Sequence, residues 1–100
     1  MKPMQSQSPR FRGAPVDVVV DVRTKLEYWM GHLPGAICIP VEQIADGLAG
    51  RADILLTSRI LVYCAGGSRS AAAAAQLRAA GYRHVVDGGG MADARAGLTP

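Results

Sequence analysis

The fold is decided by the stretch Ile60-Leu61-Val62-Tyr63-Cys64-Ala65-Gly66-Gly67-Ser68-Arg69-Ser70, which five alanines follow. The apolar residues before Cys64 are typical of a buried strand, and the alanine-rich segment after the glycines is a strong helix former. The glycines allow the backbone to curl around the sulfur, and the unpaired amides of the helix start point into that curl. Such a place stabilises a thiolate and any anion beside it, so we predict chemistry at an ionised, solvent-reachable Cys64.

Strands alternate with helices on both sides of this stretch. The patterns predict strands at 16–22, 36–39, 60–63 and 84–86, and helices at 26–30, 41–48 and 70–80. Gly88-Gly89-Gly90 is expected to end the last strand in a turn, and residues 91–100 to form a helical turn and a tail. Thr24 and Glu27 have the spacing of a capping box. This alternation predicts an α/β fold: a single domain with a small, mainly parallel sheet flanked by helices on both faces.

Length and composition limit the possible classes of protein. One hundred residues suit one domain, and 49% hydrophobic residues allow a single core. Residues 1–14 are polar and are expected to form a flexible N-terminal tail, with the domain over 15–100. The formal net charge is +3 and the basic residues are scattered, which argues against nucleic-acid binding and favours small anionic substrates. No stretch is apolar enough to span a bilayer, so we expect no membrane partner.

The sequence also predicts the cellular compartment, the state of the two cysteines and whether a metal is bound. It begins without a signal-peptide apolar region, so we expect a cytoplasmic protein; a periplasmic protein whose leader has been removed is the alternative. Two cysteines are too few for a disulfide scaffold, and Cys38 is interpreted as a small core residue within a buried strand. The histidines are separated and no cysteine pair has ligand spacing, so we expect no metal and no cofactor.

Four segments resemble the rhodanese family and occur in the family's order. They are Asp21-Val22-Arg23; Gly31-His32-Leu33-Pro34-Gly35-Ala36-Ile37 with Ile39-Pro40; Tyr63-Cys64 with Gly66-Gly67, Arg69 and Ser70; and Gly81-Tyr82 with Val85 and the glycines after it. The resemblance covers residues 16–98. Within the family, the chain is most similar to the phage-shock-type, single-domain thiosulfate sulfurtransferases. Like them it is trimmed at both ends: the strand and helix that usually precede Asp-Val-Arg are missing, and the last helix has no tryptophan.

The resemblance implies a sulfurtransferase that works by double displacement. Cys64 would attack the outer sulfur of thiosulfate or a similar donor, release sulfite and hold the transferred sulfur as a persulfide. A thiophilic acceptor, either cyanide or a small thiol, would then take that sulfur. The implied partners are this small anionic donor and this acceptor, with a sulfur-relay protein as a further alternative.

The residues after Cys64 have separate expected roles in binding the substrate. The backbone amides expected to cradle the persulfide are those of Ala65, Gly66, Gly67, Ser68, Arg69 and Ser70. The Arg69 guanidinium has a planar fork suited to an oxyanion such as thiosulfate. Ser68 and Ser70 are expected either to cap the next helix or to hydrogen-bond the sulfur. Family loops often have a basic residue where this chain has Ala65, so donor binding depends on Arg69 and the backbone, and thiosulfate need not be the best donor.

Two charged residues at the end of the first strand are expected to support the site structurally. A pair formed by Asp21 and Arg23 can pin the loop that follows the strand, and Glu27 can join the pair. No histidine adjoins Cys64, so its activation is expected from the loop amides, the helix dipole and Arg69.

Two other classes of function stay open. Cysteine phosphatases and arsenate reductases also place a thiolate in an amide-lined loop closed by arginine, but their signature has five residues between the two and a histidine before the cysteine. Here four residues intervene, and Tyr63 precedes Cys64. The smaller ring of amides suits a single sulfur better than a phosphoryl group. A sulfur carrier or a rhodanese-like binding module with little turnover is the other alternative.

Overall fold

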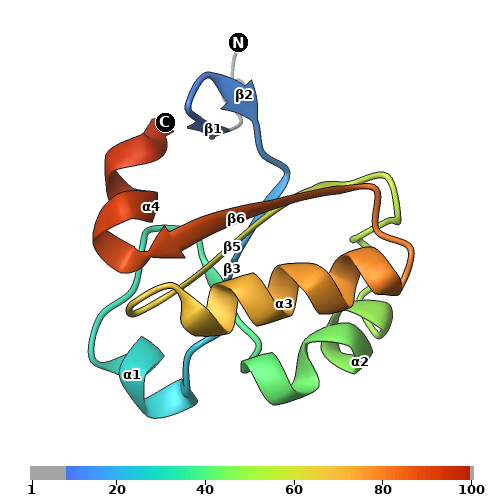
Figure 1. The fold of residues 1–100 in the computed structure, drawn as a ribbon, viewed down its shortest axis with the longest axis horizontal. Coiled ribbons are helices and arrows are strands. Elements are labelled where there is room, and N and C mark those ends of the chain that lie inside the picture. The colour runs from blue at the N-terminus through green and yellow to red at the C-terminus, as the bar shows by residue number, and fades with distance from the viewer. Residues whose placement is uncertain (1–8, 100) are drawn as a thin grey trace, which may run out of the picture.

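The computed structural model describes residues 9–99 and is built around a parallel sheet of four strands. The strands are β3 (Val18–Asp21), β4 (Ile37–Cys38), β5 (Arg59–Cys64) and β6 (His84–Gly90), in the spatial order β4-β3-β5-β6. Every neighbouring pair is parallel. Helices lie on both sides of this sheet (Figure 1). The α/β class and the mainly parallel sheet predicted from the sequence are therefore confirmed.

The central strands β3 and β5 are covered on both faces, as their continuous apolar runs predict. Successive side chains of a strand point to opposite faces. Val19 and Leu61 accordingly enter one core cluster, while Val20 and Val62 enter another, and all four are buried. The core consists of two layers, one on each side of the sheet.

Two helices cover the face that carries Val20 and Val62 (Figure 1). They are α2 (Ile44–Ala49), which the 3-10 turn η2 (Val41–Gln43) precedes, and α3 (Ser68–Ala79). The small alanine side chains of α3 allow its backbone to lie close to the strands. The helix predicted over 41–48 is thus divided into a 3-10 turn and a shorter α-helix, and the helix predicted over 70–80 begins earlier, at Ser68.

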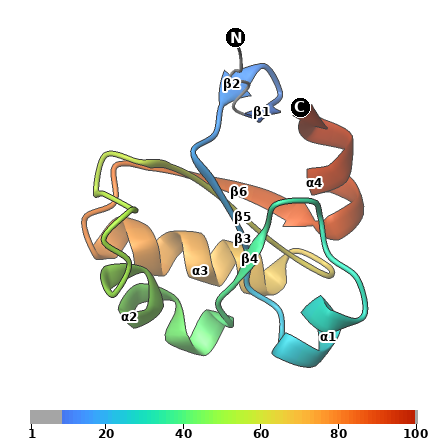
Figure 2. The same cartoon turned by 180° about the vertical axis from the view of Figure 1, so that it is seen from behind.

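The opposite face is covered by α4 (Met91–Gly97), whose Ala94 is buried in the same cluster as Leu61 and Tyr63. α3 and α4 lie on opposite sides of β6 in both views of the chain (Figures 1 and 2). Helices therefore flank the sheet on both faces, as the sequence predicted.

The helix α1 (Lys25–Trp29) connects β3 to β4 and begins with a capping box. The backbone N–H of Glu27 donates to the Thr24 hydroxyl, and the backbone N–H of Thr24 donates to the Glu27 carboxylate. The capping box predicted from the spacing of these residues is confirmed. No residue of α1 is buried, and Trp29 and Met30 are largely exposed.

β6 continues through Gly88, Gly89 and Gly90, where the sequence predicted a turn. A Cβ at Gly88 would lie 3.0 Å from both the Leu61 side chain and the Val62 carbonyl oxygen. The strand therefore passes so close to β5 that a side chain at Gly88 would force its neighbours to shift. The prediction of a turn was wrong because Gly88 and Gly90 serve a close backbone approach, while Gly89 holds a φ of +79° within the strand.

A second, antiparallel sheet joins the two ends of the described chain. It consists of β1 (Arg10–Phe11), β2 (Ala14–Pro15) and β7 (Leu98–Thr99), in the order β2-β1-β7. The sequence placed residues 10–14 in a tail, whereas the structure places them in this hairpin; residues 1–8 of the expected tail lie outside the described residues. Strands of two residues are too short to show a periodic pattern, so no sequence pattern predicts them.

Candidate active site

Cys64 is the last residue of β5, and the loop after it leads directly into α3. The strands are parallel, so the carboxyl end of β5 lies between the carboxyl ends of β3 and β6. This is the edge of the sheet at which ligands bind in related folds. Both cysteines of the chain, Cys38 and Cys64, are free thiols.

The sulfur of Cys64 accepts hydrogen bonds from two backbone amides. The N–H of Gly67 donates to Sγ at 2.9 Å, and the N–H of Ser70 donates at 3.3 Å. Gly67 has a φ of +109°, a conformation that glycine adopts without strain. The structure thus brings Gly67 and Ser70, two of the loop residues expected at the site, directly to the sulfur.

The surroundings of Cys64 favour its thiolate. Burial raises the pKa of the thiol, but hydrogen bonds from Ser70, Gly67 and Arg69 have the larger combined effect. The pKa of Cys64 therefore lies below its ordinary value of 9.0. These donors belong to the loop and to the first turn of α3, where the helix dipole also favours negative charge. Ionisation of this thiol needs no neighbouring basic side chain.

The Cys64 side chain is fully buried, at 0% exposure. The sequence predicted a sulfur that solvent can reach, and this conformation contradicts that prediction. The reason is that the loop closes over the sulfur to bring the amides of Gly67 and Ser70 within hydrogen-bonding distance. Ala65 and Gly66, directly after Cys64, are exposed. A substrate can therefore reach the sulfur only if residues around it move.

Of the two roles predicted for the loop serines, Ser70 has the second, because it hydrogen-bonds the sulfur of Cys64. Gly67 is the N-cap of α3, and no side chain caps this helix, so neither Ser68 nor Ser70 has the predicted capping role. The Ser70 hydroxyl donates to the carbonyl oxygens of Gly67 at 2.9 Å and Gly89 at 3.3 Å, which ties the helix start to β6. Ser68 is exposed at the first position of α3. Without a side-chain cap, the first amides of the helix stay available to the sulfur.

Gly90 supports the loop from β6, and sequence reasoning missed this contact. A Cβ at Gly90 would lie 2.8 Å from the Ala65 carbonyl oxygen. The same oxygen accepts a hydrogen bond from the N–H of Met91 at 3.4 Å. The run of glycines in the sequence was a signal for unusual backbone packing, but nothing linked it to the loop after Cys64.

Asp21 and Arg23 form a buried ion pair at the end of β3. The Arg23 guanidinium donates to the Asp21 carboxylate from Nη2 at 2.8 Å and from Nε at 3.0 Å. Their side chains are 9% and 0% exposed. Arg23 also donates to the Gly31 carbonyl oxygen at 2.6 Å, which holds the segment after α1 against β3. These contacts are those of a structural support.

Tyr63, the residue directly before Cys64, belongs to the same hydrogen-bond network. Its hydroxyl donates to Asp21 Oδ2 at 2.8 Å and accepts a hydrogen bond from the N–H of Leu33 at 3.0 Å. Burial raises the pKa of the Tyr63 phenol, which keeps it neutral. The sequence indicated only that Tyr63 stands where phosphatases have histidine, because its partners are distant along the chain.

Arg69 pairs with Glu27 of α1. Its terminal nitrogens donate to the two carboxylate oxygens at 2.7 Å and 3.1 Å. The adjacent Arg69 guanidinium, helped by the backbone N–H of Thr24, lowers the pKa of Glu27 to about 2. The sequence predicted that Glu27 would join the pair of Asp21 and Arg23; it binds Arg69 instead. Donor binding by Arg69 stays a prediction.

Cys38 lies on β4 opposite Asp21. It is half-buried, whereas the sequence predicted a core position, because β4 is an edge strand of the sheet. Its thiol lies 3.8 Å from the Arg23 carbonyl oxygen, and burial raises its pKa. The pKa values of the two thiols thus shift in opposite directions, which makes Cys38 an internal control for Cys64.

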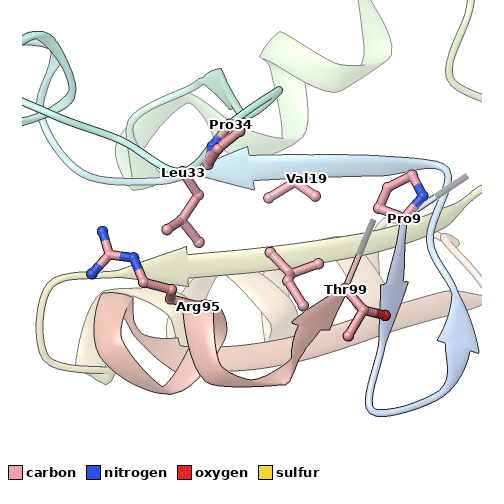
Figure 3. A pocket seen from close by; sticks show the side chains of 7 residues that line it. Pro9, Val19, Leu33, Pro34, Arg95 and Thr99 are labelled. Atoms are coloured by element: carbon pink, nitrogen blue, oxygen red, sulfur yellow. The ribbon is translucent and has the colours of Figure 1, made fainter.

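Two hollows in the surface lie away from Cys64. The first, of about 230 Å³, is lined by Pro9, Val19, Leu33, Pro34, Arg95, Leu98 and Thr99. Leu33 and Val19 lie on one side of it and Thr99 on the other (Figure 3). The second, of about 340 Å³, includes Arg51 and Asp53 of the segment before β5. Cys64 lines neither hollow, so the candidate site is the loop itself.

Among residues 9–99, no group of three or more His, Cys, Asp or Glu side chains is placed to hold a metal ion. No helix within these residues combines the length and the apolar character that crossing a membrane requires.

Comparison with known proteins identifies relatives across most of the chain. The rhodanese-like domain family matches residues 6–93. A sulfurtransferase of Allochromatium vinosum is 33% identical over 96 residues, which cover 94% of this chain and 87% of that protein. The thiosulfate sulfurtransferase PspE of Escherichia coli is 34% identical over 74 residues, which cover 74% of this chain and 70% of that protein.

Other relatives are much longer than this chain. A tRNA uridine(34) hydroxylase of Erwinia tasmaniensis is 38% identical over 80 residues, which cover 75% of this chain but only 23% of that protein. Among solved structures, a rhodanese with anions from E. coli has a TM-score of 0.71 and 34% identity, and the match covers 76% of this chain and 88% of that one. The fold, the order of the motifs and these relatives agree, and the chain belongs to the rhodanese-like domain family of sulfurtransferases.

Proposed function

We propose that this protein transfers a sulfane sulfur from thiosulfate or a similar donor to cyanide or a small thiol, through a persulfide on Cys64. The observation that carries the proposal is the Cys64 sulfur held by the amides of Gly67 and Ser70, in surroundings that lower its pKa. Sulfur transfer needs a thiolate rather than a thiol, and this arrangement stabilises one.

The first half-reaction loads the sulfur. The Cys64 thiolate attacks the outer sulfur of thiosulfate and forms a new S–S bond. The S–S bond of the donor breaks, and sulfite leaves with its electron pair. The terminal sulfur of the resulting persulfide carries the negative charge, which the amides at the start of α3 stabilise.

The second half-reaction transfers the sulfur from Cys64 to the acceptor. A nucleophilic acceptor attacks the terminal sulfur of the persulfide, and the Cys64 thiolate leaves with the electron pair of the broken bond. Neither step requires a proton at Cys64, which agrees with a loop whose side chains include no acid or base between Cys64 and Arg69.

Access to the sulfur is the remaining requirement. Cys64 is at 0% exposure, so its surroundings must move for the donor, and we expect the exposed loop residues Ala65 and Gly66 to move aside. A Cβ built on Gly66 meets nothing within 4 Å, so this part of the loop has space around it. The burial of the sulfur also favours a second candidate function, a carrier that shields its persulfide and turns over slowly.

Steady-state turnover distinguishes these functions. With thiosulfate and cyanide, we expect the wild-type protein and Cys38→Ser to form thiocyanate continuously, and Cys64→Ser to form none. A single turnover per protein molecule would instead indicate a carrier. Hydrolysis of an aryl phosphate without any thiocyanate would contradict the proposal and favour a cysteine phosphatase.

A further inference from the structure

The charged side chains at the active-site loop form two closed pairs. Arg69 is bound by Glu27, and Arg23 is bound by Asp21. The formal charges of these four groups sum to zero. The side chains between Cys64 and Arg69 carry no charge either. Anion binding at this loop therefore starts from neutral side-chain surroundings and a negative Cys64 thiolate.

Glu27 occupies the edge of the Arg69 guanidinium that Nη1 and Nη2 form. Both of its carboxylate oxygens accept from the guanidinium, at 2.7 Å and 3.1 Å. This two-point geometry is the one in which an arginine would otherwise bind the oxygens of a sulfonate group. An oxyanion that approaches this edge of Arg69 must therefore compete with a carboxylate already in place.

The Glu27 carboxylate is also fixed from its own helix. The backbone N–H and the hydroxyl of Thr24 lie 3.0 Å and 3.1 Å from Glu27 Oε1. The capping box of α1 thus holds the carboxylate in the position where it meets Arg69. Displacing Glu27 would cost both the ion pair and part of the helix cap.

We infer that Glu27 is a specificity-determining residue, which withholds Arg69 from the donor and makes the site favour sulfur donors with one negative charge over the thiosulfate dianion. This inference rests on the proposed function and names its donor class: monoanionic organic compounds with a terminal sulfane sulfur. Thiosulfate brings two negative charges beside the Cys64 thiolate, and a monoanion brings one.

A matched pair of donors tests the inference. Thiosulfate and methanethiosulfonate both offer a terminal sulfur bonded to an oxidised sulfur, but they carry two charges and one. In both, the Cys64 thiolate forms an S–S bond to the terminal sulfur, and sulfite or methanesulfinate leaves with the electron pair. The measurement is kcat/KM for each donor with cyanide as acceptor, for the wild type and Glu27→Gln.

Glu27→Gln removes the charge but keeps a side chain that suits the capping box. Electrostatic free energy scales with the charge of the donor, so we expect kcat/KM to rise about tenfold for thiosulfate and about threefold for methanethiosulfonate. The change should appear mainly in KM and should shrink as salt is added, because salt screens exposed charges. A role of Glu27 in folding alone would alter both donors equally.

Two further variants serve as controls. Asp53→Asn removes the same charge from an exposed ion pair with Arg51, in the segment before β5 at the other end of the strand from Cys64, and should leave the donor ratio unchanged. The double variant Glu27→Gln/Arg69→Gln should lose the gain for thiosulfate, because the freed guanidinium is gone.

The possible failures are distinguishable. If both donors support turnover and their ratio is the same in the wild type and Glu27→Gln, the inference about Glu27 is overturned while the proposed function stands. The inference about Glu27 is also overturned if the double variant Glu27→Gln/Arg69→Gln keeps the rise in kcat/KM for thiosulfate. If neither donor yields thiocyanate with the wild type, the proposed function fails and the inference fails with it.

Discussion

Cys64 is activated by main-chain groups, and the residues around it matter mainly through the backbone conformations they allow. Gly67 places its N–H 2.9 Å from the sulfur while holding a φ of +109°. Ser70 contributes its amide, and its hydroxyl ties the helix start to the carbonyl oxygens of Gly67 and Gly89. The backbone curve of the loop, together with Ser70, therefore sets the pKa of Cys64.

Gly67→Ala should raise the pKa of Cys64. Alanine is strained at a φ of +109°, although a Cβ there would meet only ordinary contacts, so the amide should turn away from the sulfur. The thiolate exists above the pKa and is lost as pH falls through it. Thiolate absorbance, measured against pH in a Cys38→Ser background, should therefore disappear at a higher pH in the variant.

Gly66→Ala is the matched control for this titration. Gly66 has no positive φ, and a Cβ on it would meet nothing within 4 Å. We expect its titration curve to overlay that of the Cys38→Ser parent. Equal curves for Gly67→Ala and the parent would mean that the Gly67 amide does not stabilise the thiolate.

The sequence could predict the loop because its signals are local. A cysteine followed by glycines, between an apolar run and an alanine-rich segment, indicates an amide-lined turn without further information. The pair of Arg69 and Glu27 joins residues 42 positions apart, and so does the hydrogen bond from Tyr63 to Asp21. Such pairs depend on how strands are ordered in the sheet, which no local pattern shows.

At the scale of elements, β6 is positioned by its close approach to β5 and to the loop. Gly88 faces Leu61 and the Val62 carbonyl, and Gly90 faces the Ala65 carbonyl. The sequence predicted the start of β6 correctly from its β-branched residues. It could not predict the continuation through the glycines, since glycine usually interrupts a strand.

Gly90→Ala should destabilise the protein and disturb the site together. The new Cβ would lie 2.8 Å from a backbone oxygen, so the loop or the strand must shift. We expect the free energy of unfolding to fall by about 1–3 kcal/mol, as for other overpacked sites. Thiocyanate formation should fall as well, because the Ala65 carbonyl belongs to the loop that covers Cys64.

Gly50→Ala is the control for Gly90→Ala. Both variants are compared with the wild type by urea unfolding and by the rate of thiocyanate formation. Gly50 ends α2 with a right-handed backbone, and a Cβ there would make ordinary contacts at 3.7 Å. Its free energy of unfolding should stay within about 1 kcal/mol of the wild type. A Gly90→Ala protein as stable and active as Gly50→Ala would show that β6 does not constrain the loop.

At the scale of the whole molecule, the small sheet of β1, β2 and β7 closes one face of the fold. Phe11 of β1 is 4% exposed and packs against Gly97 of α4. It belongs to the same core cluster as Leu61 and Tyr63. The two ends of the described chain are therefore part of the core that lies under the strand carrying Cys64.

Phe11→Ala should lower the free energy of unfolding by about 3 kcal/mol, because a buried aromatic side chain is lost and a cavity is left. Sulfur transfer at Cys64 should persist under conditions in which the variant stays folded. Trp29→Ala, which removes an aromatic side chain that is 86% exposed, should change the stability by less than about 0.5 kcal/mol. Equal urea midpoints for the two variants would show that the hairpin is not part of the cooperative fold.

The most direct test of the account is the mass of the intact protein after exposure to a sulfur donor, followed by mapping of the modified peptide. We expect a gain of one sulfur atom, located on the peptide that contains Cys64 and removed by cyanide. Cys64→Ser should gain nothing, and Cys38→Ser should load like the wild type. Sulfur found on Cys38, or loading that persists in Cys64→Ser, would contradict the assignment of Cys64 as the sulfur-carrying nucleophile.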